Sequence, residues 1–331
     1  MTMTVQAGFY LMTLGAGLIL SFALYAARLH RRGLPAGLAL TTLFFSIPFG
    51  YLFAKLVYII CRFRASILNY GLAAFIRLRP EEFSFAGGAI GVILAVAMCA
   101  RLRKRSPAEA LDIFAPAGCL LVAFARAGEY FLGSVGWGDY LEIEWLCRFP
   151  FAAQNRYGEW FLAVFTFEAL IALIICALAL VREERYQAHR GLLFAHTAYS
   201  LCICQIFPEM LRAVTIIFSF VRTEQVVCAL TALGLLWFVC AKLHARGKKG
   251  AYRPLIWIWV LAGLNIALQF ALDKPYLFID PLPLSENANA WMMEHSAIIF
   301  YCIMVVCIVL MLMLMIRAAH TLAAKSGKRS R

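Results

Sequence analysis

Long apolar segments separated by short polar ones dominate the pattern along the chain. A transmembrane helix needs roughly 20 consecutive, mostly apolar residues to cross the hydrocarbon core of a bilayer. Segments of this length recur along almost the whole sequence, and charged residues gather between them. The pattern predicts an all-α integral membrane protein with about nine transmembrane helices. The predicted spans cover residues 8–27, 40–61, 86–101, 110–128, 159–181, 192–211, 225–243, 254–272 and 296–317.

Composition agrees with this pattern. Hydrophobic residues make up 63% of the chain and charged residues only 15%, and the mean hydropathy is +0.79. A soluble domain needs more charge than this to cover its surface. The composition therefore excludes an ordinary soluble enzyme and leaves a multi-pass membrane protein.

The net charge of +13 indicates how the chain is oriented in the membrane, and it does not indicate a charged ligand. Basic residues gather around 28–32, 101–105, 182–190 and 242–253 and after the last span, in every second connection. Because cytoplasmic loops carry an excess of Lys and Arg, the N-terminus is expected outside and the C-terminus in the cytoplasm. No basic residues precede the first apolar run, so we expect no cleavable signal peptide. This distribution does not suggest nucleic acid as a partner.

The eleven cysteines indicate packing rather than redox or metal chemistry. Most of them lie inside apolar runs, where a cysteine behaves as a small hydrophobic residue. No Cys-x-x-Cys pair is present. The sequence therefore predicts neither a disulfide framework nor a metal site, and it calls for no cofactor.

The ionisable residues inside the predicted spans are the candidates for chemistry, because such groups are rare in membranes and are usually functional. Arg126 and Glu129 lie three residues apart at the end of the fourth span. Arg126 could hold a lipid phosphate through two parallel hydrogen bonds, or the pair could be a structural ion pair. Glu209 and Arg212 are likewise three residues apart at the end of the sixth span, where Glu209 is a further functional candidate or the two form a local salt bridge.

Three further features of the predicted spans are candidates for a functional role. Lys55 could extend towards the outer interface or contact a ligand. Glu168, in the fifth span, is a further intramembrane charge. Gly87 and Gly88 open the third span, where they could admit an anion to a helix N-terminus or permit tight helix packing.

Six ordered segments resemble the bacterial prolipoprotein diacylglyceryl transferases, over roughly residues 5–247. Each segment is short, but their order, spacing and position relative to the spans match the family. The segments are 54–58 (Ala-Lys-Leu-Val-Tyr), 83–91 (Phe-Ser-Phe-Ala-Gly-Gly-Ala-Ile-Gly), 112–116 (Asp-Ile-Phe-Ala-Pro), 125–133 (Ala-Arg-Ala-Gly-Glu-Tyr-Phe-Leu-Gly), 167–170 (Phe-Glu-Ala-Leu) and 205–212 (Gln-Ile-Phe-Pro-Glu-Met-Leu-Arg).

The resemblance implies a fold and a function. Residues 1–247 would form a seven-span transferase-like domain, and residues 248–331 an extension with two further spans. The reaction would move a diacylglyceryl group from phosphatidylglycerol to the lipobox cysteine thiol of a prolipoprotein at the bacterial inner membrane, with glycerol phosphate leaving. The implied catalytic residues are Arg126 and Glu209. The implied substrate-binding residues are Lys55, Gly87, Gly88, Gly128, Glu129, Gly133, Glu168, Gln205 and Arg212.

Several positions differ from the family pattern. Ala86 stands where the family has a histidine, Glu129 replaces an asparagine, and Gln205 replaces an arginine. Ser134 replaces an acidic residue, and a His-Pro pair before the fifth span is missing. Two hypotheses besides an active transferase follow. One is a relative that binds lipid or lipoprotein without chemistry, and the other is a transporter or channel, against which the sparse intramembrane charge argues.

Overall fold

The computed structural model describes residues 3–218, 221–280 and 285–324. The chain divides into two compact units, Met1–Leu230 and Thr231–Arg331. The basic residues predicted after the last span fall partly in 325–331, outside the described part of the chain. The division predicted at residue 247 concerns function and stays a prediction.

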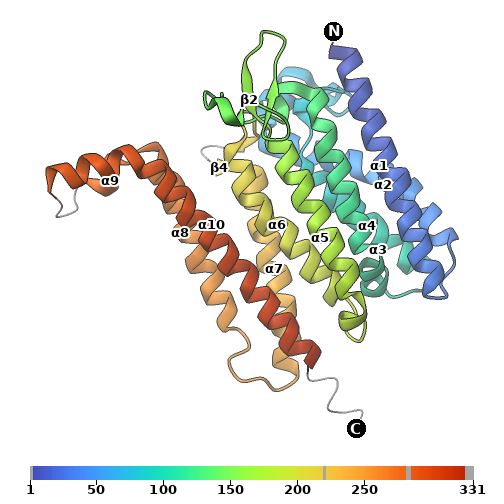
Figure 1. Cartoon of the computed structure of the whole chain (residues 1–331). Coiled ribbons are helices and arrows are strands. Elements are labelled where there is room, and N and C mark those ends of the chain that lie inside the picture. Colours follow the sequence, from blue (N-terminus) through green and yellow to red (C-terminus); the bar gives the residue numbers. More distant parts are fainter. Residues whose placement is uncertain (1–2, 219–220, 281–284, 325–331) are drawn as a thin grey trace. The chain divides into compact units, whose positions relative to one another are not determined.

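The first unit is a helical bundle (Figure 1). Long apolar segments form its helices because a helix satisfies every backbone hydrogen bond within one segment, as the bilayer core requires. The helices are α1 (Met3–Arg31), α2 (Gly37–Cys61), α3 (Phe85–Leu102), α4 (Pro107–Gly128), α5 (Val164–Tyr186), α6 (Leu192–Leu211) and the beginning of α7 (Thr223–Ala245).

The second unit contains the rest of α7 and the helices α8 (Arg253–Asp273), α9 (Tyr276–Ile279) and α10 (Glu286–Ala324). The helices α8 and α10 pack against each other as an antiparallel pair (Figure 1). Arg246, which follows α7, donates a 2.8 Å hydrogen bond from Nη1 to the carbonyl of Leu322 near the end of α10. This unit therefore has helix-to-helix contacts of its own.

The predicted all-α membrane fold is confirmed. Eight helices of the described chain are long and apolar enough to cross a membrane, namely α1 to α5, α7, α8 and α10. The sixth predicted span, 192–211, is the helix α6, which these eight do not include. Its sequence carries the polar residues His196, Gln205 and Glu209 among apolar ones.

Two predicted boundaries were wrong. The fifth span was expected from residue 159, but α5 begins at Val164 because residues Trp160–Leu162 form strand β2. The last span was expected from residue 296, but α10 begins at Glu286. The first ten residues of α10 include Glu286 and Glu294, so the helix continues beyond the apolar stretch that hydropathy detects.

Short elements join the ends of these helices. After α2 come η1 (Arg64–Leu68), η2 (Gly71–Phe75) and η3 (Pro80–Glu82). After α4 come η4 (Glu129–Val135), η5 (Glu144–Leu146) and the antiparallel strands β1 (Ala152–Gln154) and β2 (Trp160–Leu162). After α6 come the antiparallel strands β3 (Ile217–Phe218) and β4 (Val221–Arg222). The β1–β2 hairpin lies at the end of the unit where α1 begins (Figure 1).

The first unit has a large hydrophobic core at one end and a group of buried charges at the other. A hydrophobic core joins the later half of α1, the start of α2, the end of α3 and the start of α4, around Phe22, Tyr25 and Phe114. Several buried charges lie at the other end of α4 and at the end of α6. Arg28, near the end of α1 beside the apolar core, is also buried and pairs with Glu183 at 3.0 Å.

Candidate functional site

Arg126 stands in the last turn of α4 and is 2% exposed. Its guanidinium carbon lies 3.6 Å from the centroid of the Phe85 ring, at the start of α3. Its Nη1 atom lies 2.6 Å from Oε1 of Glu129, one turn further along the chain. A basic residue is favourable at a helix C-terminus, and the close carboxylate compensates the charge that burial would otherwise destabilise.

Arg212 follows directly after α6 and is buried beside the same carboxylate. Its Nη2 atom lies 2.6 Å from Oε2 of Glu129, and its Nη1 donates a 2.9 Å hydrogen bond to the carbonyl of Val135. Its Nε atom lies 3.5 Å from Oε2 of Glu209, three residues earlier. Glu129 therefore bridges the two guanidinium groups.

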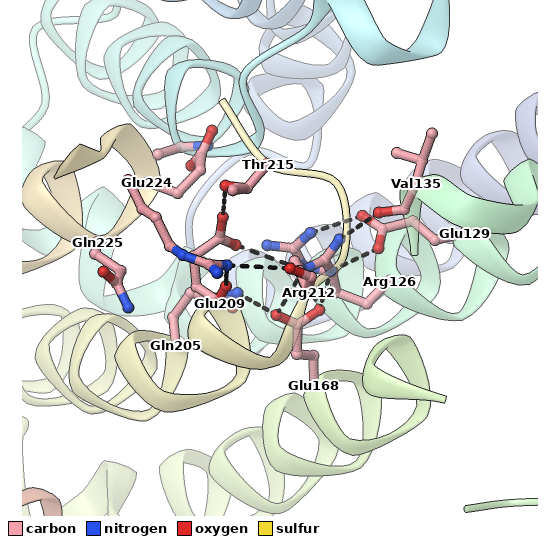
Figure 2. Close-up of polar contacts among 12 residues, drawn as sticks. Arg126, Glu129, Val135, Glu168, Gln205, Glu209, Arg212, Thr215, Glu224 and Gln225 are labelled. Carbon is pink, nitrogen blue, oxygen red and sulfur yellow. Dashed lines mark hydrogen bonds and ion pairs between the residues drawn. The ribbon is translucent and has the colours of Figure 1, made fainter. Parts of the chain in front are cut away.

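Glu168, on α5, is the second bridge. Its Oε2 atom lies 3.3 Å from Nε of Arg126, and it also pairs with Nη2 of Arg212. Its other oxygen accepts hydrogen bonds from Nε of Arg212, at 3.3 Å, and from the side chain of Gln205. In Figure 2 the side chains of Glu129 and Glu168 approach Arg212 from two sides. Side chains from α4, α5 and α6 thus converge on one point.

The cluster of Arg126, Glu129, Glu168, Glu209 and Arg212 contains two guanidinium groups and three carboxylates, all buried. Breaking one pair in such a network leaves an uncompensated charge in a medium of low polarity, which is strongly destabilising. The network also has a chemical consequence. An incoming phosphate that binds Arg126 or Arg212 must compete with the chain's own carboxylates.

Two glycines frame Glu129. Gly128 lies against α1, where an added Cβ would meet Tyr10 and Thr13 at 3.1 and 3.2 Å. Gly133 has φ 65° and ψ −125°, a conformation open essentially to glycine alone. This turn brings the carbonyl of Val135 back to Arg212. These glycines therefore shape the backbone around the charged cluster.

The start of α3 is occupied by a carboxylate of the protein itself. Glu224, in the first turn of α7, accepts a 2.7 Å hydrogen bond from Oγ of Ser84 and a 2.8 Å bond from the backbone N–H of Ala86. Gly87 donates its N–H to Oγ of Ser84 at 3.0 Å. A Cβ on Gly87 would lie 2.6 Å from the carbonyl of Phe53, so α3 packs here on the backbone of α2. An added Cβ on Gly88 would meet only an ordinary contact, Ala54 at 3.7 Å.

Lys55, for which the sequence left open an extension towards the outer interface or a contact with a ligand, pairs with an acidic residue of the segment between α2 and α3. It is fully buried, with its Nζ 3.0 Å from Oε2 of Glu82 and 4.4 Å from the centroid of the Phe83 ring. Arg77 lies 3.4 Å from the other oxygen of Glu82. Lys55 therefore belongs to a separate ion pair and makes no contact with the cluster around Arg126.

Most of the residues described above lie in the segments that resemble the prolipoprotein diacylglyceryl transferases. Comparison with known proteins decides whether the chain belongs to that family. The sequence model of the family described as prolipoprotein diacylglyceryl transferase matches residues 2–241. The chain belongs to the prolipoprotein diacylglyceryl transferase family. The predicted family is thereby confirmed.

Relatives within this family are similar at low identity. A phosphatidylglycerol–prolipoprotein diacylglyceryl transferase of Clostridium kluyveri is 27% identical over 208 residues, 62% of this chain and 79% of the relative. A protein of the same name from Clostridium botulinum strain Langeland is 25% identical over 233 residues, 69% of this chain and 88% of the relative. One from Clostridium novyi is 24% identical over 185 residues, 55% of this chain and 70% of the relative. The chain is a divergent member of the family.

The structure brings together six of the predicted site residues and leaves others apart. Arg126, Glu129, Glu168, Gln205, Glu209 and Arg212 share the cluster or its edge. Sequence reasoning missed Glu82, Thr215, Arg222 and Glu224. Arg222 and Glu224 flank the start of the seventh span, so an ionisable group at the edge of an apolar run was the available signal. The partners of Glu82 and Thr215 had no comparable signal, because they are set by tertiary packing.

Proposed function

We propose that this protein transfers a diacylglyceryl group from phosphatidylglycerol to the lipobox cysteine thiol of a prolipoprotein. The observation that carries the proposal is the convergence of Arg126, Glu168 and Arg212 in one buried cluster. These residues come from three separate helices, and each belongs to a segment that resembles the family. The names of the relatives supply the lipid and the acceptor.

The reaction forms one bond and breaks one. The cysteine sulfur bonds to the glycerol carbon of the lipid, and the bond from that carbon to the phosphate oxygen breaks. Glycerol phosphate leaves with the bonding electrons. Guanidinium groups stabilise the charge that develops on the phosphate, and we assign this role to Arg126. The thiol proton needs an acceptor, and we assign that role to the carboxylate of Glu209.

The remaining predicted residues have supporting roles in this proposal. Glu129, Glu168, Gln205 and Arg212 would hold the cluster around the headgroup. Lys55, Gly87, Gly88, Gly128 and Gly133 would shape the surrounding helices and turns. We assign the activity to residues 1–247 and regard residues 248–331 as an extension. The proposed location is the bacterial inner membrane, with the N-terminus outside and the C-terminus in the cytoplasm.

A second candidate is a protein that binds lipid or lipoprotein without chemistry. The observation in its favour is that carboxylates of the chain already occupy both arginines of the cluster. An enzyme must exchange at least one of these pairs for the substrate phosphate, whereas a binding protein could keep them all. The two candidates therefore differ in turnover.

In vitro transfer separates them. Purified protein in detergent is mixed with phosphatidylglycerol labelled in its acyl chains and a lipobox peptide. Label should move to the peptide, and Arg126→Ala should abolish the transfer. Arg148→Ala, which changes an exposed arginine after η5, should leave it unchanged. Folded wild-type protein that binds the lipid but gives no labelled peptide would refute the transferase and favour the binding role.

A further inference from the structure

Arg222 is a third guanidinium group at the edge of the cluster. It ends strand β4, directly before α7. Its Nη1 atom donates hydrogen bonds to the carbonyls of Glu209, at 2.5 Å, and Arg212, at 3.1 Å. These carbonyls belong to the C-terminal end of α6, where a cation also complements the helix dipole. One nitrogen therefore fixes the guanidinium in place.

The other donors of Arg222 remain available. Within residues 3–218, 221–280 and 285–324, Nε and Nη2 have no hydrogen-bond partner, and the side chain forms no ion pair. The residue is half-buried. Arg126 and Arg212 are instead buried, and each is paired with at least two carboxylates. Arg222 is thus held by neutral carbonyls alone and keeps its positive charge uncompensated by a contacting carboxylate.

Arg222 contacts the end of α6, the helix that carries Gln205. Gln205 stands where the family pattern has an arginine, and it lies one helical turn before Glu209 on α6. The Gln205 side chain donates to Glu168 and carries no charge. Arg222 reaches the same end of α6 from strand β4, by its bond to the carbonyl of Glu209. A guanidinium is therefore supplied at this end of α6 by another element.

We propose that Arg222 binds the phosphate of the lipid substrate, in compensation for the missing arginine at position 205. A phosphodiester can accept two parallel N–H bonds from one guanidinium, and Nε and Nη2 are the donors that Arg222 retains. The initial binding at Arg222 leaves the ion pairs around Arg126 in place, and the exchange of one of them belongs to the later transfer step. The inference rests on the proposed function for the identity of the lipid, but the anion contact can be measured without turnover.

Equilibrium binding of three ligands tests the contact. Phosphatidylglycerol, diacylglycerol and inorganic phosphate are each used to displace a fluorescent phosphatidylglycerol from the purified full-length protein. Wild type should prefer phosphatidylglycerol to diacylglycerol. Arg222→Gln should reduce the affinity for phosphatidylglycerol by about 10- to 100-fold, the usual effect of losing a charged hydrogen bond, and leave the affinity for diacylglycerol unchanged.

A matched variant controls for the loss of a helix-end arginine. Arg246→Gln also removes a guanidinium bound to a backbone carbonyl, and it should leave the lipid preference unchanged. If Arg222→Gln fails to fold, Arg222→Lys takes its place, with an expected loss of about tenfold, because lysine cannot offer two parallel donors. A purely structural role would lower the unfolding temperature without changing the preference between the two lipids.

The outcomes distinguish this inference from the proposed function. Loss of the phosphatidylglycerol preference in a folded variant supports the contact, even if wild type transfers no label to the peptide. If inorganic phosphate displaces the probe from wild type but not from the variant, this also supports the contact. The ratio of the affinities for phosphatidylglycerol and inorganic phosphate then shows whether the contact serves a lipid or a free ion. An unchanged preference in the folded Arg222 variant would overturn the inference, whatever the transfer assay gives.

Discussion

The backbone N–H of Ala86 donates a 2.8 Å hydrogen bond to the carboxylate of Glu224, 138 residues later in the chain. The same carboxylate accepts from Ser84 at 2.7 Å. The exposed donors of a helix N-terminus attract anions, and here the anion is supplied by α7. A carboxylate of the chain therefore ties the start of α3 to the start of α7.

Replacing Glu224 with Gln should lower the free energy of unfolding by about 2 kcal/mol, because a hydrogen bond to a charged group contributes about that much. The amide keeps one oxygen but presents an N–H₂ group to the remaining donor. Unfolding in mixed detergent micelles measures the change. Glu142→Gln, at an exposed position, is the control and should have no effect. Equal stability of the two variants would contradict the tie between α3 and α7.

Replacing Glu129 with Gln should strengthen the binding of anionic lipid. The change removes one of three carboxylates that surround Arg126 and Arg212 and weakens the two 2.6 Å pairs that Glu129 makes. A phosphate then meets less competition, and we expect an increase in affinity for phosphatidylglycerol of about tenfold, or about 1.4 kcal/mol. Lipid displacement measures it. A weaker affinity in folded protein would mean that Glu129 supports the lipid site instead of competing with it.

The Lys55–Glu82 pair should behave as a buried unit. Lys55→Met leaves Glu82 with only the 3.4 Å contact to Arg77, and the free energy of unfolding should fall by about 3 kcal/mol, as when one partner of a buried pair is removed. Adding Glu82→Gln should restore part of this loss because the uncompensated charge disappears. A double-mutant cycle measures the coupling. Strictly additive effects would show that the pair has no energetic importance.

Gly133→Ala should destabilise the turn after α4 by roughly 1–3 kcal/mol, the range for a residue held in a sparsely populated backbone conformation. The space for a Cβ is open at this position, so the positive φ alone causes the loss. Gly15→Ala is the matched control, because its Cβ would also meet nothing within 4 Å and its φ is not positive. Thermal unfolding of both variants should show a loss only at position 133.

The spans were predictable because hydrophobicity is a local property. The prediction for residues 192–211 coincides with α6, even though this helix carries polar groups of the cluster. The extension of α10 to Glu286 was not predictable in this way. Its first residues form a helix but include polar side chains. Hydropathy detects only the apolar part of the helix.

The local ion pairs were predictable for a similar reason. Spacing of three residues on a helix predicted both Arg126–Glu129 and Glu209–Arg212, and both pairs form. The contacts that join them do not follow from spacing. Glu168 meets both arginines only because α5 packs beside α4 and α6, and Arg222 reaches the carbonyl of Glu209 only because strand β4 lies beside the end of α6. Long-range pairs of this kind depend on packing that a single sequence does not reveal.

The length of α10 has a consequence for the membrane. A straight helix of 39 residues would span about 58 Å at a rise of about 1.5 Å per residue, whereas a bilayer with its headgroups measures about 40–45 Å. The 21 residues of its neighbour α8 span only about 32 Å, close to the hydrocarbon thickness. Figure 1 shows that α10 bends near its beginning, so its length is not directed along a single axis. The part after the bend packs along α8, and the polar start from Glu286 has the composition of a segment that lies at a membrane–water interface.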